Sequence, residues 1–325
     1  MNRKLVCFGF FVACLLVALS IELASATEPK ILNVGWTGGS NWTSLPFRVA
    51  AERGLFEKEG LKVRYITFQG TNLMLTALLA GEIDYVNILP FIAGGAARGL
   101  PVKIVAAVAK SSGYAIVSRP EIESLKALKG KRIAINSFGS SADFAVYTAL
   151  SRSGLDPNKD VTLAAVSGSP DARFAALIGG SVDATVVNSP LEYKAEQKGF
   201  KTLMSVRELS ELVRIPITGL SLAQKKIDKD PDEIVRVLRG LRAAILYIQS
   251  QREIGVGLLE KLLNIDRAAA ERFYTLYREQ FNPELSVPDA VAEEWIAVGT
   301  FRAKEKPTVK PQTVYDWTFA EKAKR

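Results

Sequence analysis

The stretch KRIAINSFGSSADFAVYTALSRS, residues 131–153, changes character twice along its length. It begins with a short apolar run that contains β-branched isoleucines, continues through Gly/Ser turn residues at 137–141, and ends in an amphipathic segment. Asp143 sits where the first turn of a helix favours an acid, and Gly154 follows as a stop signal. The stretch therefore predicts a strand, a loop and a helix, in that order.

A helix that begins after such a loop has free backbone N–H groups and the positive end of its dipole facing the loop. The hydroxyls of Ser137, Ser140 and Ser141 would add donors beside them. Such a corner suits an anionic group. We therefore predict a binding role for these serines and for the adjoining Phe138 and Gly139.

The chain repeats this arrangement. Ile31–Val34 is an apolar run that leads into a Gly-rich loop at 35–40 and then into a helix beginning near Pro46. The segments 77–84 and 176–183 each indicate a helix ended by glycine, a turn through aspartate and then a short strand. This duplication predicts two similar α/β lobes whose loops converge on one cleft.

The length and composition allow both lobes to have real cores, since the 325 residues are 48% hydrophobic and 23% charged. We predict that lobe one comprises residues 27–115 and 216–325 and that lobe two comprises residues 116–215. Tyr114–Val117 is expected to be an extended crossing segment between them. From Asp230 onward the spacing predicts a helical tail that packs on lobe one and has a structural role.

The first 26 residues have the pattern of an export signal. Arg3 and Lys4 precede the apolar run Leu5–Ile21, and Ala24-Ser25-Ala26 has the form of a signal-peptidase site. We expect residues 1–26 to be a cleaved signal peptide, with the mature chain in the periplasm and not inserted in the membrane. The alternative is an uncleaved membrane anchor, because the apolar run is at the lower length limit for spanning a bilayer.

Composition excludes several classes of function. The chain has no histidine, and its two cysteines, Cys7 and Cys14, both lie in the predicted signal peptide. The usual general base, the commonest metal ligand and the cysteine nucleophile are therefore missing from the mature chain. We predict no catalytic residues, no metal and no cofactor. The net charge of +8 favours anionic partners, but the basic residues are scattered and predict no nucleic-acid binding.

Further candidate binding residues lie in loops and at helix starts. The first Gly-rich loop offers an aromatic wall and polar donors in Trp36, Thr37, Asn41 and Trp42. The alternative for both tryptophans is that they cap the core of lobe one. A predicted helix start and the handover between lobes supply Gln69, Gly70, Thr71, Ser111, Ser112 and Tyr114, for which ordinary capping and turn roles are the alternative.

Four polar residues follow or precede matching elements of the two lobes. Asn87 and Asn188 end matching strands, where a carboxamide can bind a ligand or tie down its own loop. Asp84 and Asp183 are interpreted as turn formers and not as a catalytic carboxylate pair. Arg173 lies one turn into a predicted helix and is within reach of a ligand carboxylate or sulfonate, although a surface position is the commoner outcome.

The order of these pieces resembles a known family. An export signal, a strand with a Gly/Ser loop, the segment AAERGLFEKEGLKV at 50–63, and the turns Gly81–Asp84 and Gly180–Asp183 are similar to the periplasmic substrate-binding proteins of the NMT1/THI5-like and SsuA-like family. The resemblance implies a type II periplasmic binding protein fold, α/β, with a ligand enclosed by hinge closure. The ligands of such proteins are sulfonates, nitrate or bicarbonate, pyrimidine precursors and aromatic acids, and their partners are an ABC transporter permease and its ATPase.

The family also implies alternatives. One branch, the fungal pyrimidine synthases, consumes an active-site histidine and carries a cysteine-rich motif, which this sequence does not have. We predict a monomeric periplasmic solute receptor for a small organic anion that does no chemistry. An enzyme of the same fold, such as a futalosine-type lyase, and a ligand-sensing ectodomain remain open at this point.

Overall fold

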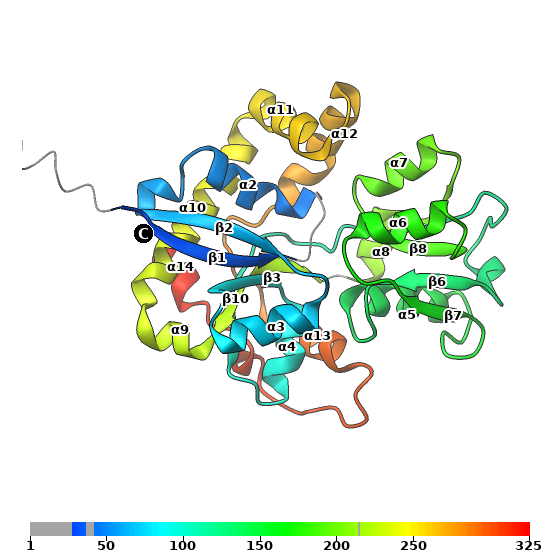
Figure 1. Cartoon of the computed structure of the whole chain (residues 1–325), viewed down its shortest axis with the longest axis horizontal. Coiled ribbons are helices and arrows are strands. Elements are labelled where there is room, and N and C mark those ends of the chain that lie inside the picture. The colour runs from blue at the N-terminus through cyan, green and yellow to red at the C-terminus, as the bar shows by residue number, and fades with distance from the viewer. Residues whose placement is uncertain (1–27, 37–41, 214) are drawn as a thin grey trace, which may run out of the picture.

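The computed structural model describes residues 28–36, 42–213 and 215–325, which form two α/β lobes (Figure 1). The first lobe is built on a mixed sheet of strand order β2-β1-β3-β10-β4. Its strands are β1 (Lys30–Trp36), β2 (Leu61–Thr67), β3 (Tyr85–Ile88), β4 (Val102–Ala107) and β10 (Thr218–Ala223). Strands β1, β2 and β3 pair in parallel, and β10 runs antiparallel to both of its neighbours.

The second lobe repeats this plan with the strand order β7-β6-β8-β5-β9. Its strands are β5 (Tyr114–Ser118), β6 (Arg132–Ile135), β7 (Thr162–Ala165), β8 (Ala184–Asn188) and β9 (Lys201–Met204). Strands β6, β7 and β8 are parallel, and β5 runs antiparallel to both β8 and β9. The predicted pair of similar α/β lobes is therefore confirmed.

Helices cover both faces of each sheet (Figure 1). The first sheet has α2 (Leu45–Glu52) and α10 (Pro231–Ser250) on one face and α3 (Thr71–Ala80), α4 (Pro90–Ala97) and α13 (Asp289–Thr300) on the other. The second sheet lies between α6 (Pro170–Ile178) and α7 (Leu191–Gln197) on one side and α5 (Ser141–Arg152) and α8 (Val206–Leu212) on the other. The other α-helices in the described part of the chain are α9 (Gln224–Lys229), α11 (Arg252–Leu263), α12 (Arg267–Tyr277) and α14 (Thr318–Ala323).

Local sequence explains why helices α5 and α6 of the second lobe begin where they do. Strand β6 leads into a short loop, and Ser140 caps α5 by accepting a hydrogen bond from the backbone N–H of Asp143 at 3.2 Å. Ser169 caps α6 in the same way, with Pro170 at the first helical position. The predicted order of strand, loop and helix at 131–153 is confirmed.

One predicted connection is an integral part of a sheet. Tyr114–Val117, which we expected to be an extended crossing segment, belongs to β5 and pairs with β8 and β9. Its residues are fully buried or nearly so, because β5 lies inside the sheet between these two strands. The strands of the first sheet come from residues 30–107 and 218–223. The exact domain boundaries at 115/116 and 215/216 stay a prediction.

The lobes also touch beside the crossing segments. Trp42 stacks on Tyr277 of α12 with ring centroids 4.7 Å apart, and its backbone N–H donates to the carbonyl of Ser189. The Ser189 hydroxyl lies 2.7 Å from the Tyr277 hydroxyl and also hydrogen-bonds the Glu192 carboxyl. Burial raises the pKa of Glu192 to about 7. This hydrogen-bonded group joins α7 of the second lobe to the tail helices.

Helices α4 and α13 pack with almost no space between their backbones. A Cβ added to Gly94 would lie 2.3 Å from the carbonyl oxygen of Gly299, and one added to Gly299 would meet the Gly94 backbone. Both helices therefore depend on glycine at their crossing point. Gly257 in α11 offers a contrast, because a Cβ there would meet nothing within 4 Å.

We predict opposite effects of adding a methyl group at these helical glycines. Gly94→Ala forces α4 and α13 apart and should lower the free energy of unfolding by about 1–3 kcal/mol. Gly257→Ala only raises helix propensity and should increase that free energy by about 0.5–1 kcal/mol. Urea unfolding of both variants measures the difference. Equal stability of the two variants would contradict the close packing of α4 on α13.

The second prediction concerns Glu192. Its pKa in the folded chain lies above its ordinary value of 4.5, so the folded state binds the proton more tightly than the unfolded chain. The stabilising effect of that proton is complete below about pH 4.5 and is lost as the pH rises through about 7. Glu192→Gln mimics the protonated carboxyl and should match the wild type at pH 4. At pH 8 it should be more stable by up to roughly 3 kcal/mol.

Thermal or urea unfolding at pH 4, 6 and 8 tests this prediction. Glu305→Gln is the matched control, because Glu305 is exposed and its substitution makes the same change of charge. A stability difference between Glu192→Gln and the wild type that does not change with pH would show that Glu192 is not held in its protonated form.

Candidate functional site

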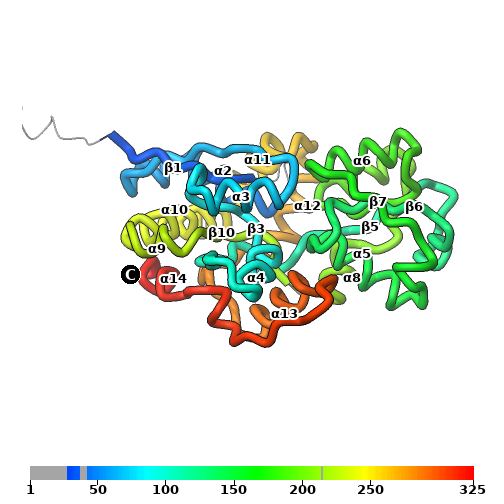
Figure 2. The backbone as a smooth tube through the Cα atoms, turned by 60° about the horizontal axis from the view of Figure 1, so that its bottom comes forward, coloured from blue at the N-terminus to red at the C-terminus, as the bar shows by residue number. Residues whose placement is uncertain are grey.

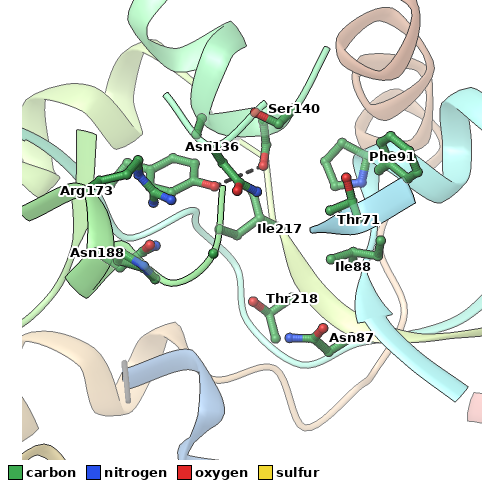
Figure 3. Close-up of a pocket in the computed structure, with 16 residues that line it drawn as sticks. Thr71, Asn87, Ile88, Phe91, Asn136, Ser140, Arg173, Asn188, Ile217 and Thr218 are labelled. Atoms are coloured by element: carbon green, nitrogen blue, oxygen red, sulfur yellow. Dashed lines mark hydrogen bonds between the residues drawn. The ribbon is translucent and has the colours of Figure 1, made fainter. Parts of the chain in front are cut away.

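A polar cavity lies between the lobes, at the ends of strands from both sheets (Figure 3). Asn87 and Ile88 end β3, Asn188 ends β8, and Asn136 directly follows β6. Thr218 opens the antiparallel strand β10 and therefore lies at the same edge of the first sheet. The cavity thus occupies the usual ligand position in an open α/β sheet, outside the carboxyl ends of its parallel strands.

Helix N-termini from both lobes also reach this cavity. Its lining includes Thr71 at the start of α3, Pro90 at the start of α4, Ser141 at the start of α5 and Pro170 at the start of α6. Each helix N-terminus carries the positive end of a dipole and backbone N–H groups without helical partners. Four such ends around one space give the cavity a positive potential. This arrangement favours an anion.

Arg173, in α6, contributes a full positive charge to the cavity lining. Its side chain is 3% exposed, lines the cavity, and donates from Nε to the backbone carbonyl of Val186 at 3.2 Å. Among the residues that the structure describes, no carboxylate forms an ion pair with it. Burial lowers the pKa of the guanidinium, and Tyr114 and Asp171 offset part of that effect. A buried cation without a partner is costly, and an anion in the cavity would remove that cost.

Neutral polar groups complete the lining. The Tyr114 hydroxyl lies 2.9 Å from the Ser141 hydroxyl, so the two are linked across β5 and α5. The buried hydroxyl of Thr71 and the buried amide oxygen of Asn87 have no hydrogen-bond partner within the described part of the chain. Asn188 is 5% exposed. These groups can donate to or accept from a ligand, since buried polar atoms normally have a partner.

The space itself is small. The cavity measures about 70 Å³, which is room for a few water molecules. Gln69 packs closely against Gly168 beside the cavity. Its side-chain oxygen lies 2.9 Å from the position that a Cβ on Gly168 would occupy. Gln69 belongs to the first lobe and Gly168 to the second, so the lobes meet at this point. The cavity therefore suits a compact head group.

The structure brings some of the predicted site residues together at this cavity. These residues are Thr71, Asn87, Tyr114, Ser140, Ser141 and Asn188. Five of them lie at corresponding places in the two lobes: Thr71, Ser140 and Ser141 at the starts of α3 and α5, and Asn87 and Asn188 at the ends of β3 and β8. Tyr114 begins β5. Gln69 and Gly70 lie beside them at the start of α3 but do not line the cavity.

Other residues of the Gly/Ser loop lie away from the cavity. Phe138 is 56% exposed, and the Arg302 guanidinium lies 5.3 Å from the centroid of its ring. The backbone N–H of Gly139 donates to the Asp143 carboxylate at 2.8 Å. The Ser137 hydroxyl is buried, and its backbone carbonyl accepts from the Ser140 hydroxyl at 2.6 Å. These three residues shape the loop, while Ser140 and Ser141 line the cavity.

The two tryptophans, and the serines Ser111 and Ser112 that precede β5, lie elsewhere. Trp42 is fully buried against Tyr277, and Ser112 is also fully buried. Trp36 packs edge-on against Phe47 and Tyr65 and borders a separate cavity of about 480 Å³. Ser111 borders a groove between α7, α8 and α12. Two further predicted residues, Thr37 and Asn41, lie outside the described residues.

Sequence reasoning missed part of the lining. Arg173 was considered within reach of a ligand, with a surface position as the commoner outcome; α6 in fact turns this residue toward the cleft and buries it. Asn136 and Thr218 were not singled out. Asn136 directly follows β6, as Asn87 and Asn188 end β3 and β8, so a polar residue at each strand end is a signal that would have identified it.

The cavity lining contains no Asp or Glu among the described residues. Within that part of the chain, no group of three or more His, Cys, Asp or Glu side chains is placed to hold a metal ion. None of the helices that the structure describes combines the length and apolar character needed to span a membrane. The groups at the cavity are hydrogen-bond donors, neutral acceptors and one guanidinium, which can bind an anion.

The fold is shared with solved binding proteins. The alkanesulfonate-binding protein SsuA from Xanthomonas axonopodis pv. citri, bound to MOPS, is 21% identical, has a TM-score of 0.73, and covers 90% of this chain and all of its own. The nitrate-binding protein NrtA from Synechocystis PCC 6803 is 14% identical with a TM-score of 0.73, covering 91% of this chain and 88% of its own. At these identities the likeness establishes the periplasmic binding protein fold.

Sequence comparison places the chain in a family. It is 30% identical over 290 residues to an aliphatic sulfonates-binding protein from Bacillus subtilis (strain 168), which covers 86% of this chain and 84% of the relative. Residues 25–254, well over half of the chain, match the NMT1-like family. Both the match and the earlier resemblance agree with the two-lobed fold and its interlobe cavity. The protein belongs to the NMT1-like family.

Proposed function

We propose that this protein is the solute-binding component of an ABC uptake transporter and binds a small organic anion between its two lobes. The relative from Bacillus subtilis is named for aliphatic sulfonates, and the Xanthomonas and Synechocystis structures are named for alkanesulfonates and nitrate. All three names describe anions. The permease and ATPase of such a transporter would be its partners, and hinge closure would enclose the ligand.

The single observation that carries this proposal is the buried Arg173. Its guanidinium faces the cavity with no carboxylate partner among the described residues, and the N-terminus of its own helix lies beside it. A guanidinium binds a carboxylate or a sulfonate through two parallel hydrogen bonds. The anionic head of the ligand would therefore lie between Arg173, the start of α5 and the start of α3.

The remaining lining supports binding without chemistry. The groups that would contact the head are hydroxyls, carboxamides and backbone N–H groups, and the cavity residues offer no acid–base pair. We propose that the ligand leaves unaltered. The predicted signal peptide would deliver the chain to the periplasm, where it would act as a monomer.

Removing the guanidinium should abolish tight binding. Arg173→Gln leaves a bound anion without its counter-charge, which typically costs about 2–5 kcal/mol, or roughly 30-fold to more than 1,000-fold in Kd. The ligand-free variant should be at least as stable as the wild type, because the substitution removes an uncompensated buried charge. Calorimetric titration with MOPS, octanesulfonate, benzoate and nitrate measures the loss, and thermal unfolding measures the stability.

Arg207→Gln is the matched control. Arg207 lies in the same lobe with an 89% exposed side chain, so its substitution changes the net charge equally but leaves the cavity intact. We expect this control to bind like the wild type. If Arg173→Gln bound its anion as tightly as Arg207→Gln did, the anion would not occupy this cavity.

A further inference from the structure

The tail of the chain makes a contact with the second lobe that the solute-receptor proposal does not use. Helix α13 packs on α4 of the first lobe through Gly94 and Gly299, and the chain continues from it into Phe301 and Arg302. The Phe301 ring lies 5.3 Å from that of Phe144 in α5, centroid to centroid. Figure 2 shows α13 beneath α4, with its far end next to the second lobe. The tail therefore bridges both lobes.

Arg302 is the centre of this bridge. Its Nη2 donates to Asp143 Oδ1 at 2.7 Å and its Nε donates to Oδ2 of the same carboxylate, which is a bidentate ion pair. Asp143 is fully buried. The guanidinium also lies 5.3 Å and 5.8 Å from the ring centroids of Phe138 and Tyr147, and the Arg302 side chain is 27% exposed. Aromatic faces attract such a cation.

Asp143 connects this ion pair to the ligand cavity. Its carboxylate accepts the backbone N–H of Gly139 at 2.8 Å, and its own N–H donates to the Ser140 hydroxyl at 3.2 Å. These two bonds fix the turn that presents Ser140 and Ser141 to the cavity. Moving Arg302 would therefore shift Asp143 and, through it, the turn that carries Ser140 and Ser141.

The charges of Arg302 and Asp143 also connect the pair to anion binding. Asp143 carries a negative charge in the first turn of α5, one turn from the place where an anion would bind. Unpaired, this carboxylate would repel the anion and cancel the positive potential of the helix start. Arg302 neutralises it. The pKa of Arg302 is raised by its bond to Asp143, which agrees with a strong pair.

We propose that the Arg302–Asp143 pair is a clamp between the lobes: it holds the cleft closed and positions the Ser140–Ser141 turn for the anion. The clamp rests on the proposed function for its effect on binding, but its effect on shape is independent of any ligand. Arg302 is a positioning residue, since it acts on the cavity through Asp143. Opening of the cleft would separate the pair.

Small-angle X-ray scattering of the ligand-free chain tests the clamp. Arg302→Gln should have a larger radius of gyration than the wild type, because the pair no longer opposes opening. Arg152→Gln is the matched control, since Arg152 is exposed at the end of α5, the helix that contains Asp143, and its substitution removes the same charge. Arg302→Lys keeps the charge but not the bidentate geometry, so its radius of gyration should lie between those of the wild type and Arg302→Gln. Identical radii for Arg302→Gln and Arg152→Gln would overturn the clamp.

Binding kinetics test the coupling to the cavity. The dissociation rate of MOPS or benzoate, whichever the wild type binds, should rise about 10-fold in Arg302→Gln, while the association rate changes little. Adding Asp143→Asn to Arg302→Gln removes the unpaired carboxylate and should recover part of the affinity. An unchanged dissociation rate in Arg302→Gln, or a double variant that binds more weakly still, would overturn the positioning role.

The two proposals fail separately. If neither compound bound the wild type but Arg302→Gln still had the larger radius of gyration, the clamp would stand and the proposed ligand class would be wrong. If the wild type bound MOPS but the radius and the dissociation rate were the same in both variants, the receptor would stand and the clamp would fail. Circular dichroism of Arg302→Lys and Arg302→Gln separates either result from a loss of folding.

Discussion

Arg173 places a positive charge where little water reaches it and where none of the described carboxylates forms an ion pair with it. Such a buried charge destabilises the folded chain unless an opposite charge or hydrogen-bonding groups lie close to it. The starts of α3, α4, α5 and α6 line the same cavity, and their helix dipoles add positive potential to that of the guanidinium. The polar strand ends then supply hydrogen bonds. The position of this one guanidinium thus determines what kind of molecule the cleft can hold.

The two lobes contribute to this arrangement in equivalent ways. Each supplies a strand end that carries an asparagine, Asn87 on β3 and Asn188 on β8, and each supplies helix starts. A ligand held between them would contact both lobes at once and would favour their closed arrangement, since a ligand shifts an equilibrium toward the state that it binds better. The contact between Gln69 and Gly168 shows that the lobes already meet beside the cavity. The Arg302–Asp143 pair is a further contact between the lobes, in the first turn of α5.

Much of the fold could be predicted from the sequence because its local signals are strong. The run of isoleucines, the Gly/Ser turn and the acid at Asp143 indicate β6 and α5 without any tertiary information. The same signals placed Ser140 and Ser141 at a helix start, where they line the cavity. Local pattern did not show that Tyr114–Val117 is an internal strand, because its register depends on β8 and β9.

The rest of the candidate site depends on tertiary packing. Nothing in the periodicity of α6 distinguishes a solvent-facing from a cleft-facing Arg173, and only the packing of α6 against β8 decides it. Trp42 fills a gap beside Tyr277, a residue more than two hundred positions later, which no local pattern can indicate. The helical tail was expected to pack on lobe one, and it also reaches the second lobe through Phe301 and Arg302.

The central claim is that the cleft holds an organic anion and returns it unaltered. Native mass spectrometry of the purified protein, incubated with the sulfonates and carboxylates and then denatured to release what is bound, tests this claim most directly. The account predicts one anionic molecule per chain, with the same mass before and after prolonged incubation. Recovery of a neutral or cationic compound, or of a product whose mass has changed, would contradict it.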